Sequence, residues 1–286
     1  MSRRRSRETP RWYWYLIGLA LTAAYVLPMA YVLLAAVTPT GQAIGKVPDG
    51  LAWSNFVDAF AQQEFGRFAI NSIVVAVVST VVQVALAMTA GYALAKLPVP
   101  GARSHLVLLI ALLVVPPEII MVPLFVLAAR LPLVGGNDIL GQGGQGLVDS
   151  LPGLVIPHLI SALAIFLMRQ FYKDLPDELA DAARVDGAGE LAIFWRIYTP
   201  LVLPAVAVVA IFALQSAWND FLWPLVMTRS VEQRTLQLGL TSFFQEHSTQ
   251  WNYLMAVVLV ISIPVVALFL WAQRWFRGDV MSGAVK

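Results

Sequence analysis

Residues 175–204, LPDELADAARVDGAGELAIFWRIYTPLVLP, form a polar interruption between two strongly apolar segments. Pro176 and the acidic residues around it are typical of a helix start, because proline pre-sets φ and carboxylates interact favourably with the helix dipole. Gly187 can end that helix, since glycine readily adopts positive φ. A second short helix is expected over about 190–198. The pattern therefore predicts a helix–glycine–helix element (residues 175–198) that forms a rigid docking surface between two segments of membrane length.

The composition is that of an integral membrane protein. Hydrophobic residues make up 59% of the chain and charged residues only 13%, and the mean hydropathy is +0.73. A typical soluble domain carries about 25% charged residues. The excess apolar residues occur in blocks long enough to cross a bilayer as helices. Cysteine is absent, which excludes disulfides and thiolate chemistry.

The apolar blocks predict an all-α protein with six transmembrane helices in a single domain, residues 1–286. The first block is longer than the ~7–15 apolar residues of a signal peptide, so we expect it to be an uncleaved span. Prolines inside several spans favour a packed bundle over independent lipid anchors. The predicted spans are roughly 13–37, 70–92, 106–128, 151–168, 201–227 and 253–275.

The basic residues predict the orientation. With the N-terminus inside, fourteen of the 19 Lys and Arg residues lie in the cytoplasm and five lie outside, as the positive-inside rule requires. Both termini and the helix–glycine–helix element are then cytoplasmic. Outside, residues 53–60 are expected to form an amphipathic interfacial helix, and the glycine-rich residues 131–150 a flexible loop.

Two acidic residues, Glu118 and Asp220, fall at membrane depth. A charge at the centre of a span costs ~2.5–3.5 kcal/mol, so such groups usually face a cavity or a partner. Asp220 alternatively lies at the membrane interface, and pairing within the bundle would explain Glu118 equally well. With Gln215, Trp218 and Asn219, Asp220 offers the amide, carboxylate and aromatic groups that bind a polyhydroxylated ligand.

The chain lacks sequence signatures of catalysis. Residues 41–47 resemble a phosphate-binding loop, but the spacing is one residue short and no Ser or Thr follows the lysine. His105, His158 and His247 lack metal-site spacing, so we expect no metal and place each histidine at an interface or in a loop. The energy for any work must therefore come from another polypeptide or from an ion gradient. Phe243, next to Phe244 and Gln245, suggests either a partner contact or packing on the membrane surface.

The motif Asp181-Ala182-Ala183, followed by Gly187, resembles the EAA motif of binding-protein-dependent ABC importer permeases. The resemblance covers nearly the whole chain and is closest to the maltose-type, MalG-like sugar-importer branch. Further matching motifs are LPDEL (175–179), RVDGA (184–188), AWNDFLWPL (217–225), TLQLG (235–239) and GAVK (283–286).

This resemblance implies the type I importer (MetI-like) permease fold in the cell membrane. It also implies three kinds of partner: a second homologous permease, two ATPase subunits that bind ATP and Mg, and an extracytoplasmic solute-binding protein. This chain itself would hold no cofactor and would not be an enzyme. The expected ATPase-coupling residues are Glu178, Asp181, Ala182, Ala183, Asp186, Gly187 and Ala188. Because the family has Glu where this chain has Asp181, a salt bridge from that position is expected to be lost or relocated; the alternative for the whole element is a re-entrant cap without a partner.

The resulting functional hypothesis is a permease subunit of an ATP-driven importer of a sugar or sugar-like solute. We predict contact with the binding protein at Phe243, Phe244 and Gln245, and no nucleic-acid partner. The alternatives are an importer of glycerol phosphate or a related polyol phosphate, a gradient-driven secondary transporter, and a membrane scaffold. The predicted substrate-pathway residues are Glu118, Gln215, Trp218, Asn219 and Asp220.

Overall fold

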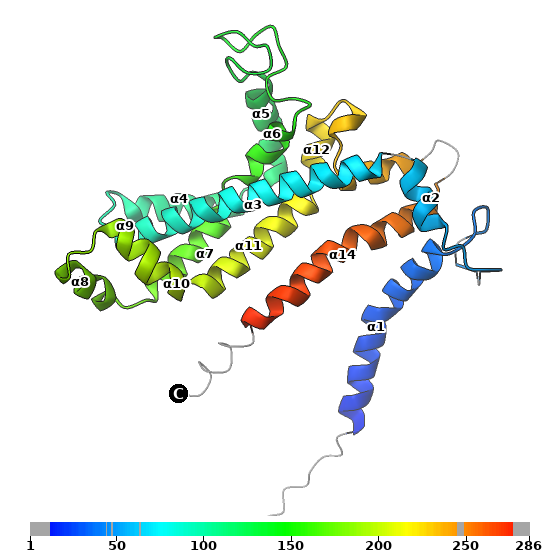
Figure 1. Ribbon diagram of the computed structural model, residues 1–286, viewed down its shortest axis with the longest axis horizontal. Coiled ribbons are helices and arrows are strands. Elements are labelled where there is room, and N and C mark those ends of the chain that lie inside the picture. Colours follow the sequence, from blue (N-terminus) through cyan, green and yellow to red (C-terminus); the bar gives the residue numbers. More distant parts are fainter. Residues whose placement is uncertain (1–11, 44, 47, 63, 245–248, 277–286) are drawn as a thin grey trace, which may run out of the picture. The chain divides into compact units, whose positions relative to one another are not determined.

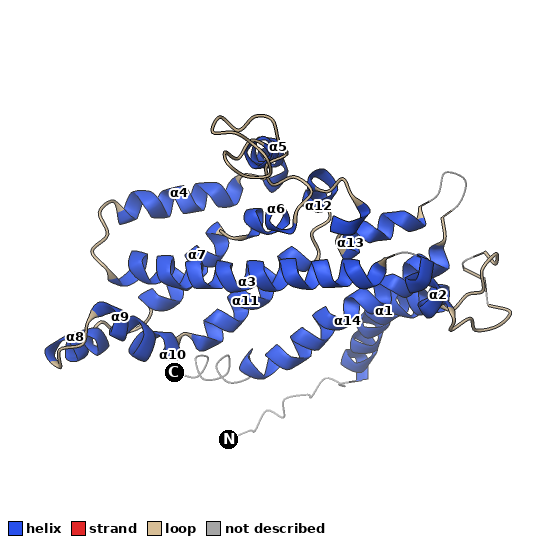
Figure 2. Ribbon diagram, turned by 45° about the horizontal axis from the view of Figure 1, so that its top comes forward, coloured by secondary structure: helices blue, strands red, loops and turns tan. Residues whose placement is uncertain are grey.

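The computed structural model describes residues 12–276 except 44, 47, 63 and 245–248. The described residues form helices and loops, and none of them belongs to a β-strand (Figures 1 and 2). The chain divides into two compact units, which are described separately. Unit 1 comprises the described parts of Met1–Gln63 and Leu240–Ser262, and unit 2 those of Glu64–Gly239 and Ile263–Lys286. The all-helical class predicted from the apolar blocks is confirmed.

Unit 1 contains helix α1 (Trp12–Ala36), helix α2 (Asn55–Gln62), the short turn η4 (Leu240–Phe243) and the first part of α14 (Trp251–Phe276). The Asn55 side-chain amide donates to the carbonyl oxygens of Ala36 (2.8 Å) and Thr38 (2.9 Å), which ties the start of α2 to the end of α1. Helix α2 overlaps the predicted amphipathic stretch, 53–60, and extends to Gln62; it buries Ala59 while exposing Val57.

The centre of unit 2 is formed by α3 (Phe65–Lys96), α7 (Ala162–Lys173) and α11 (Leu203–Trp218), which pack on one another. Gly91 allows α3 to approach α7 closely, because a Cβ atom there would lie 2.7 Å from Met168 Cβ. Helix α3 extends beyond the predicted span of 70–92 at both ends. Of its small residues, Ala76, Ser79, Ala87 and Gly91 are buried, as expected where helices of a membrane bundle approach closely, whereas Ala85 and Thr89 are exposed.

Two predicted spans, 106–128 and 151–168, are broken into bent pairs, and a third bent pair joins the helix–glycine–helix element to the fifth predicted span. Helix α4 (Ala102–Val114) meets α5 (Pro117–Ala129) at 103°, Leu151–His158 meets α7 at 45°, and Glu190–Leu201 meets α11 at 81°. The break before α5 coincides with a proline pair, and proline has no N–H to donate to the preceding turn. Three further helices, α1, α3 and Trp251–Gln273 of α14, are long and apolar enough to cross a membrane, which gives up to six spans if each bent pair counts as one.

The fifth predicted span, 201–227, is not one helix. Helix α11 ends at Trp218, and a separate helix, α12 (Leu222–Met227), follows. The Asp220 carboxylate accepts a hydrogen bond from the Trp223 backbone N–H (3.3 Å), as a helix-capping side chain does. The polar residues between the two helices therefore end one helix and start the next.

The helix–glycine–helix element has the predicted local structure. Helix α8 (Glu178–Val185) ends before Gly187, whose φ is +82°, and α9 (Glu190–Ala192) continues into the π-helical turn η2 (Ile193–Tyr198) and α10 (Thr199–Leu201). A regular α-helix over 190–198 would carry Leu191, Phe194 and Trp195 on one side, but only Phe194 is buried, whereas Leu191 and Trp195 are exposed. In the π-helical turn, positions three or four residues apart no longer share the face that they share in an α-helix.

The glycine-rich segment 131–148 is a compact, hydrogen-bonded structure in place of the flexible loop predicted from its glycines. The buried Asn137 side-chain amide donates to the carbonyl oxygens of Ala129 (2.9 Å) and Leu131 (3.0 Å), and its oxygen accepts from the Gly144 N–H (2.9 Å). A Cβ at position 144 would lie 2.3 Å from the Gly135 carbonyl oxygen. Here glycine permits close backbone packing, which composition alone does not distinguish from flexibility.

Candidate functional site

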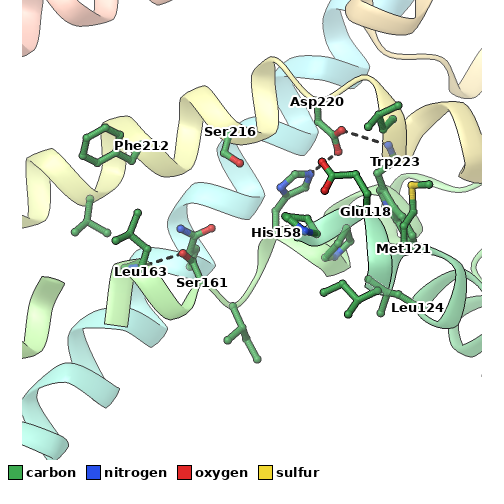
Figure 3. Close-up of a pocket in the computed structure, with 18 of the residues that line it drawn as sticks. Glu118, Met121, Leu124, His158, Ser161, Leu163, Phe212, Ser216, Asp220 and Trp223 are labelled. Carbon is green, nitrogen blue, oxygen red and sulfur yellow. Dashed lines mark hydrogen bonds and ion pairs between the residues drawn. The ribbon is translucent and has the colours of Figure 1, made fainter. Parts of the chain in front are cut away.

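Unit 2 contains a cavity of about 580 Å³ between α3, α5, η1 (Ile156–His158), α7 and α11 (Figure 3). Its walls are mostly apolar, and charged side chains gather at one end. Such a combination of apolar walls and a few polar groups is typical of small-molecule sites, whose volumes are ~300–1,000 Å³. The polar residues that line it are Gln83, Glu118, His158, Ser161, Ser216 and Asp220.

His158 and Asp220 form the polar end of this cavity. The His158 Nε2 atom lies 3.0 Å from Asp220 Oδ2, and the two side chains are only 14% and 17% exposed. The contact is a hydrogen bond that becomes an ion pair when the imidazole is protonated. The Glu118 carboxylate points toward the same end from α5 (Figure 3). Two carboxylates and one imidazole can thus donate to and accept from the hydroxyl groups of a ligand.

The loop between α11 and α12 is fixed by a second contact across the cavity wall. The buried Trp223 indole N–H donates to the Gly153 carbonyl oxygen at 2.9 Å, which ties α12 to α6 (Leu151–Val155). Together with the His158–Asp220 contact, this bond holds residues 220–223 against residues 153–158, which are far away in the sequence.

Trp223→Phe should lower the free energy of unfolding by about 1–3 kcal/mol, the cost of leaving a buried carbonyl without its donor. Unfolding of the purified protein in detergent, followed against temperature and denaturant, measures the change. Trp195→Phe is the matched control. Because Trp195 is 55% exposed, this substitution is expected to leave the stability unchanged. Equal stability of the Trp223 variant and the wild type would contradict the role of the indole bond.

The structure brings together only two of the five predicted substrate-pathway residues, Glu118 and Asp220. Gln215 is exposed outside the cavity lining, and Trp218 is buried away from it. The Asn219 side-chain oxygen accepts a hydrogen bond from the Gln237 amide (3.3 Å). Because α11 ends here, residues next to each other in sequence point in different directions.

His158 is the functional candidate that sequence reasoning missed. The sequence analysis assigned it to an interface or loop, although 151–168 was itself a predicted span. An ionisable residue within a span is by default a candidate for a functional role, and applying that rule to His158 would have found it. Its partner, 62 residues away, could not be read from local spacing.

Arg184 joins two acidic residues of the helix–glycine–helix element. Its guanidinium donates to Asp181 Oδ1 and to Glu190 Oε1, both at 2.8 Å. The hydrogen bond from Arg184, opposed by partial burial, holds the pKa of Glu190 below its ordinary value. Asp181 therefore has a salt bridge within its own chain, to Arg184.

The predicted ATPase-coupling residues divide between the surface and the interior. Ala183 is buried and Ala188 is half-buried, so both support the element from within. Near them, Val185 is an exposed apolar side chain (88%). The coupling candidates that are exposed are Glu178, Asp181, Ala182, Asp186 and Gly187.

The three residues predicted to contact a binding protein differ in placement. Phe243 is 1% exposed and packs against Tyr253, with ring centroids 6.3 Å apart. Phe244 is 55% exposed, and Gln245 lies outside the described residues. Of the aromatic pair, only Phe244 therefore presents a surface to a partner.

Among the described residues, no group of three or more His, Asp or Glu side chains has a geometry that could hold a metal ion. His105 Nδ1 lies 2.9 Å from the Gly101 carbonyl oxygen one turn earlier, and His247 lies outside the described residues.

Comparison with known proteins identifies similar chains along almost the full length. The family model described as "Binding-protein-dependent transport system inner membrane component" matches residues 83–281. The arabinooligosaccharides transport system permease protein AraQ of Bacillus subtilis is 30% identical, with 98% of this chain and 99% of that protein covered. The sn-glycerol-3-phosphate transport system permease protein UgpE of Yersinia enterocolitica is 35% identical, with 76% of this chain and 74% of that protein covered. The diacetylchitobiose uptake system permease protein NgcG of Streptomyces coelicolor is 27% identical, with 91% and 84% covered.

The fold is also similar to a chain of a solved structure. A bacterial ABC transporter involved in the import of the acidic polysaccharide alginate matches with a TM-score of 0.77, at 22% identity, over 96% of this chain and 100% of that chain. The predicted type I importer fold is confirmed.

Proposed function

The chain belongs to the family of inner-membrane components of binding-protein-dependent transport systems, and we propose that it forms, with a second permease, the pathway for a sugar or sugar-like solute. The observation that carries the proposal is the cavity of unit 2, in which Glu118, His158 and Asp220 meet at one end of an apolar chamber. Carboxylates and an imidazole bind hydroxyl groups, and the apolar walls accept the faces of sugar rings.

A neutral solute fits this cavity better than a polyol phosphate does. Relatives named for arabinooligosaccharides and diacetylchitobiose support a sugar, whereas the relative named for sn-glycerol-3-phosphate supports the alternative. The cavity lining contains two carboxylates and, among the residues that the structure describes there, no Lys or Arg. A carboxylate is a hydrogen-bond acceptor without a cationic partner for a phosphate, and it repels the phosphate when it is ionised.

The proposed assembly contains two cytoplasmic ATPase subunits and an extracytoplasmic solute-binding protein besides the second permease. The positive-inside distribution of Lys and Arg supports cytoplasmic termini and a helix–glycine–helix element on the ATPase side. Its exposed face around Asp186 is then available to the ATPase. ATP-driven closure of the ATPase pair moves this element, and the bundle alternates between outward-open and inward-open states.

The proposal is tested by reconstituting the complete complex in proteoliposomes with its binding protein. We expect ATP hydrolysis to be stimulated by binding protein loaded with a neutral oligosaccharide, together with uptake of that sugar. Faster uptake of glycerol 3-phosphate would replace the sugar with the phosphate alternative. Uptake that needs an ion gradient and no ATP would identify a secondary transporter, and the absence of any uptake would leave the scaffold hypothesis.

A further inference from the structure

Helix α3 is the longest uninterrupted helix of unit 2. It has no proline, and its 32 residues give a length of about 48 Å at 1.5 Å per residue. Pro123 interrupts the sequence of α5, and α11 begins only after a sharp bend. Sharp kinks in helices occur mainly at proline, so the continuous α3 is better suited than α5 or α11 to move as one body.

The C-terminal end of α3 binds the start of the helix–glycine–helix element through Lys96. Its ammonium donates to the Leu175 carbonyl oxygen (2.6 Å) and to Asp177 Oδ1 (2.5 Å), and it lies 5.3 Å from the centroid of the Tyr198 ring. The Lys96 side chain is only 5% exposed. A nearly buried ammonium with three partners in one element fixes that element relative to α3.

Tyr92, one turn earlier on the same face of α3, binds the other side of the element. Its hydroxyl donates to Glu190 Oε2 at 3.0 Å, and Glu190 in turn accepts from Arg184. The Tyr92 ring packs against Phe194 and Tyr198, with centroids 5.0 and 5.7 Å apart. Two residues of α3 therefore hold the segments on both sides of the Gly187 turn.

The N-terminal end of α3 binds a different segment, residues 232–236. The Asn71 amide donates to the carbonyl oxygens of Glu232 (2.8 Å) and Arg234 (2.9 Å), and the Ser72 hydroxyl accepts from the Leu236 N–H (2.8 Å). Between the two ends, Gln83 lines the cavity. One rigid helix thus contacts the helix–glycine–helix element, the cavity and the segment at its opposite end.

From these contacts we infer that α3 is the strut that carries movement of the helix–glycine–helix element to the cavity, with Tyr92 and Lys96 as the positioning residues. The inference rests on the proposed function, because it names the route by which ATP hydrolysis reaches the solute. Loss of either residue leaves the membrane helices packed but lets the element move without α3. The two global states are then less strongly coupled to ATP.

The first test measures solute taken up per ATP hydrolysed in the reconstituted complex. Tyr92→Phe keeps the ring and removes the hydroxyl, and Lys96→Met keeps the chain and removes the charge. We expect each variant to lower this ratio about fivefold, the lower end of typical coupling effects. Lys96→Arg keeps the positive charge and should keep the wild-type ratio. Tyr172→Phe, in the same aromatic cluster, and Lys173→Met, an exposed lysine at the end of α7, are the matched controls and should keep the wild-type ratio.

The second test does not depend on transport. Because the sequence has no cysteine, spin labels can be placed at Val81→Cys on α3 and Val185→Cys on α8, both on exposed side chains. We expect one narrow distance distribution with and without ATP, and a broad one after Lys96→Met. A wild-type ratio of solute to ATP in both Tyr92→Phe and Lys96→Met would overturn the strut. A distance between the two labels that changes with ATP while Lys96 is present would overturn it as well. Absence of uptake by the wild type contradicts the proposed function instead, and the distance measurement still decides the strut.

Discussion

Gly187→Leu is expected to leave membrane insertion intact while lowering solute uptake by about tenfold or more. The glycine has φ = +82°, and a Cβ atom added there would meet no atom within 4 Å, so overlap of the Cβ with a neighbour is not the cause. An L-residue held in the left-handed region costs ~1–2 kcal/mol, and the turn relaxes to avoid that cost. The angle between α8 and the following helix then changes, and the exposed face around Asp186 no longer fits the proposed ATPase subunit.

A series at this position separates backbone conformation from side-chain size. Gly187→Asn should retain most of the uptake, because asparagine tolerates positive φ, while Gly187→Val should behave like the leucine variant. Uptake and ATP hydrolysis are measured together with the amount of inserted protein. Normal uptake by both the Val and Leu variants would show that the turn does not set the coupling geometry.

The Gly187 turn shows what local sequence can predict. Pro176, the acidic first turn and the glycine act within one or two helical turns of themselves, and the structure contains the helix they predict. The apolar blocks likewise predicted the helical class, since each must satisfy its own backbone hydrogen bonds in lipid. The exact number of continuous helices was less predictable. A proline such as Pro117 can kink a span slightly, or it can begin a second helix that is bent by 103° from the first.

The candidate site was only partly predictable because it depends on long-range contacts. Glu118 and Asp220 were found from the cost of a charge at membrane depth, which is a property of single positions. The pairing of Asp220 with His158, and of Lys96 with Asp177, joins residues 62 and 81 positions apart. No local pattern encodes such contacts. The same limit explains Phe243, whose burial against Tyr253 depends on how its segment folds back.

Asp220→Ala is expected to lower uptake about tenfold or more, and it should also destabilise the cavity end. The substitution removes both the partner of His158 and the acceptor of the Trp223 backbone N–H. A loss of ~1.4 kcal/mol of interaction in one of the two transport states is a tenfold change. Asp220→Asn separates the two roles, because the amide keeps an oxygen for the Trp223 N–H but removes the negative charge. Uptake and thermal unfolding are measured for both.

The double variant Asp220→Asn with His158→Gln decides whether charge or hydrogen bonding matters at this end of the cavity. If the pair acts only as a structural tie, two neutral amides at 3.0 Å replace it and uptake recovers toward the wild type. If the carboxylate binds solute hydroxyls, uptake stays low although unfolding returns to normal, because a charged acceptor forms stronger hydrogen bonds than an amide does. Asp138→Asn, in the glycine-rich segment, is the control for removal of a carboxylate outside the cavity. Wild-type uptake by Asp220→Ala would exclude Asp220 from both roles and leave Glu118 as the acidic group of the cavity.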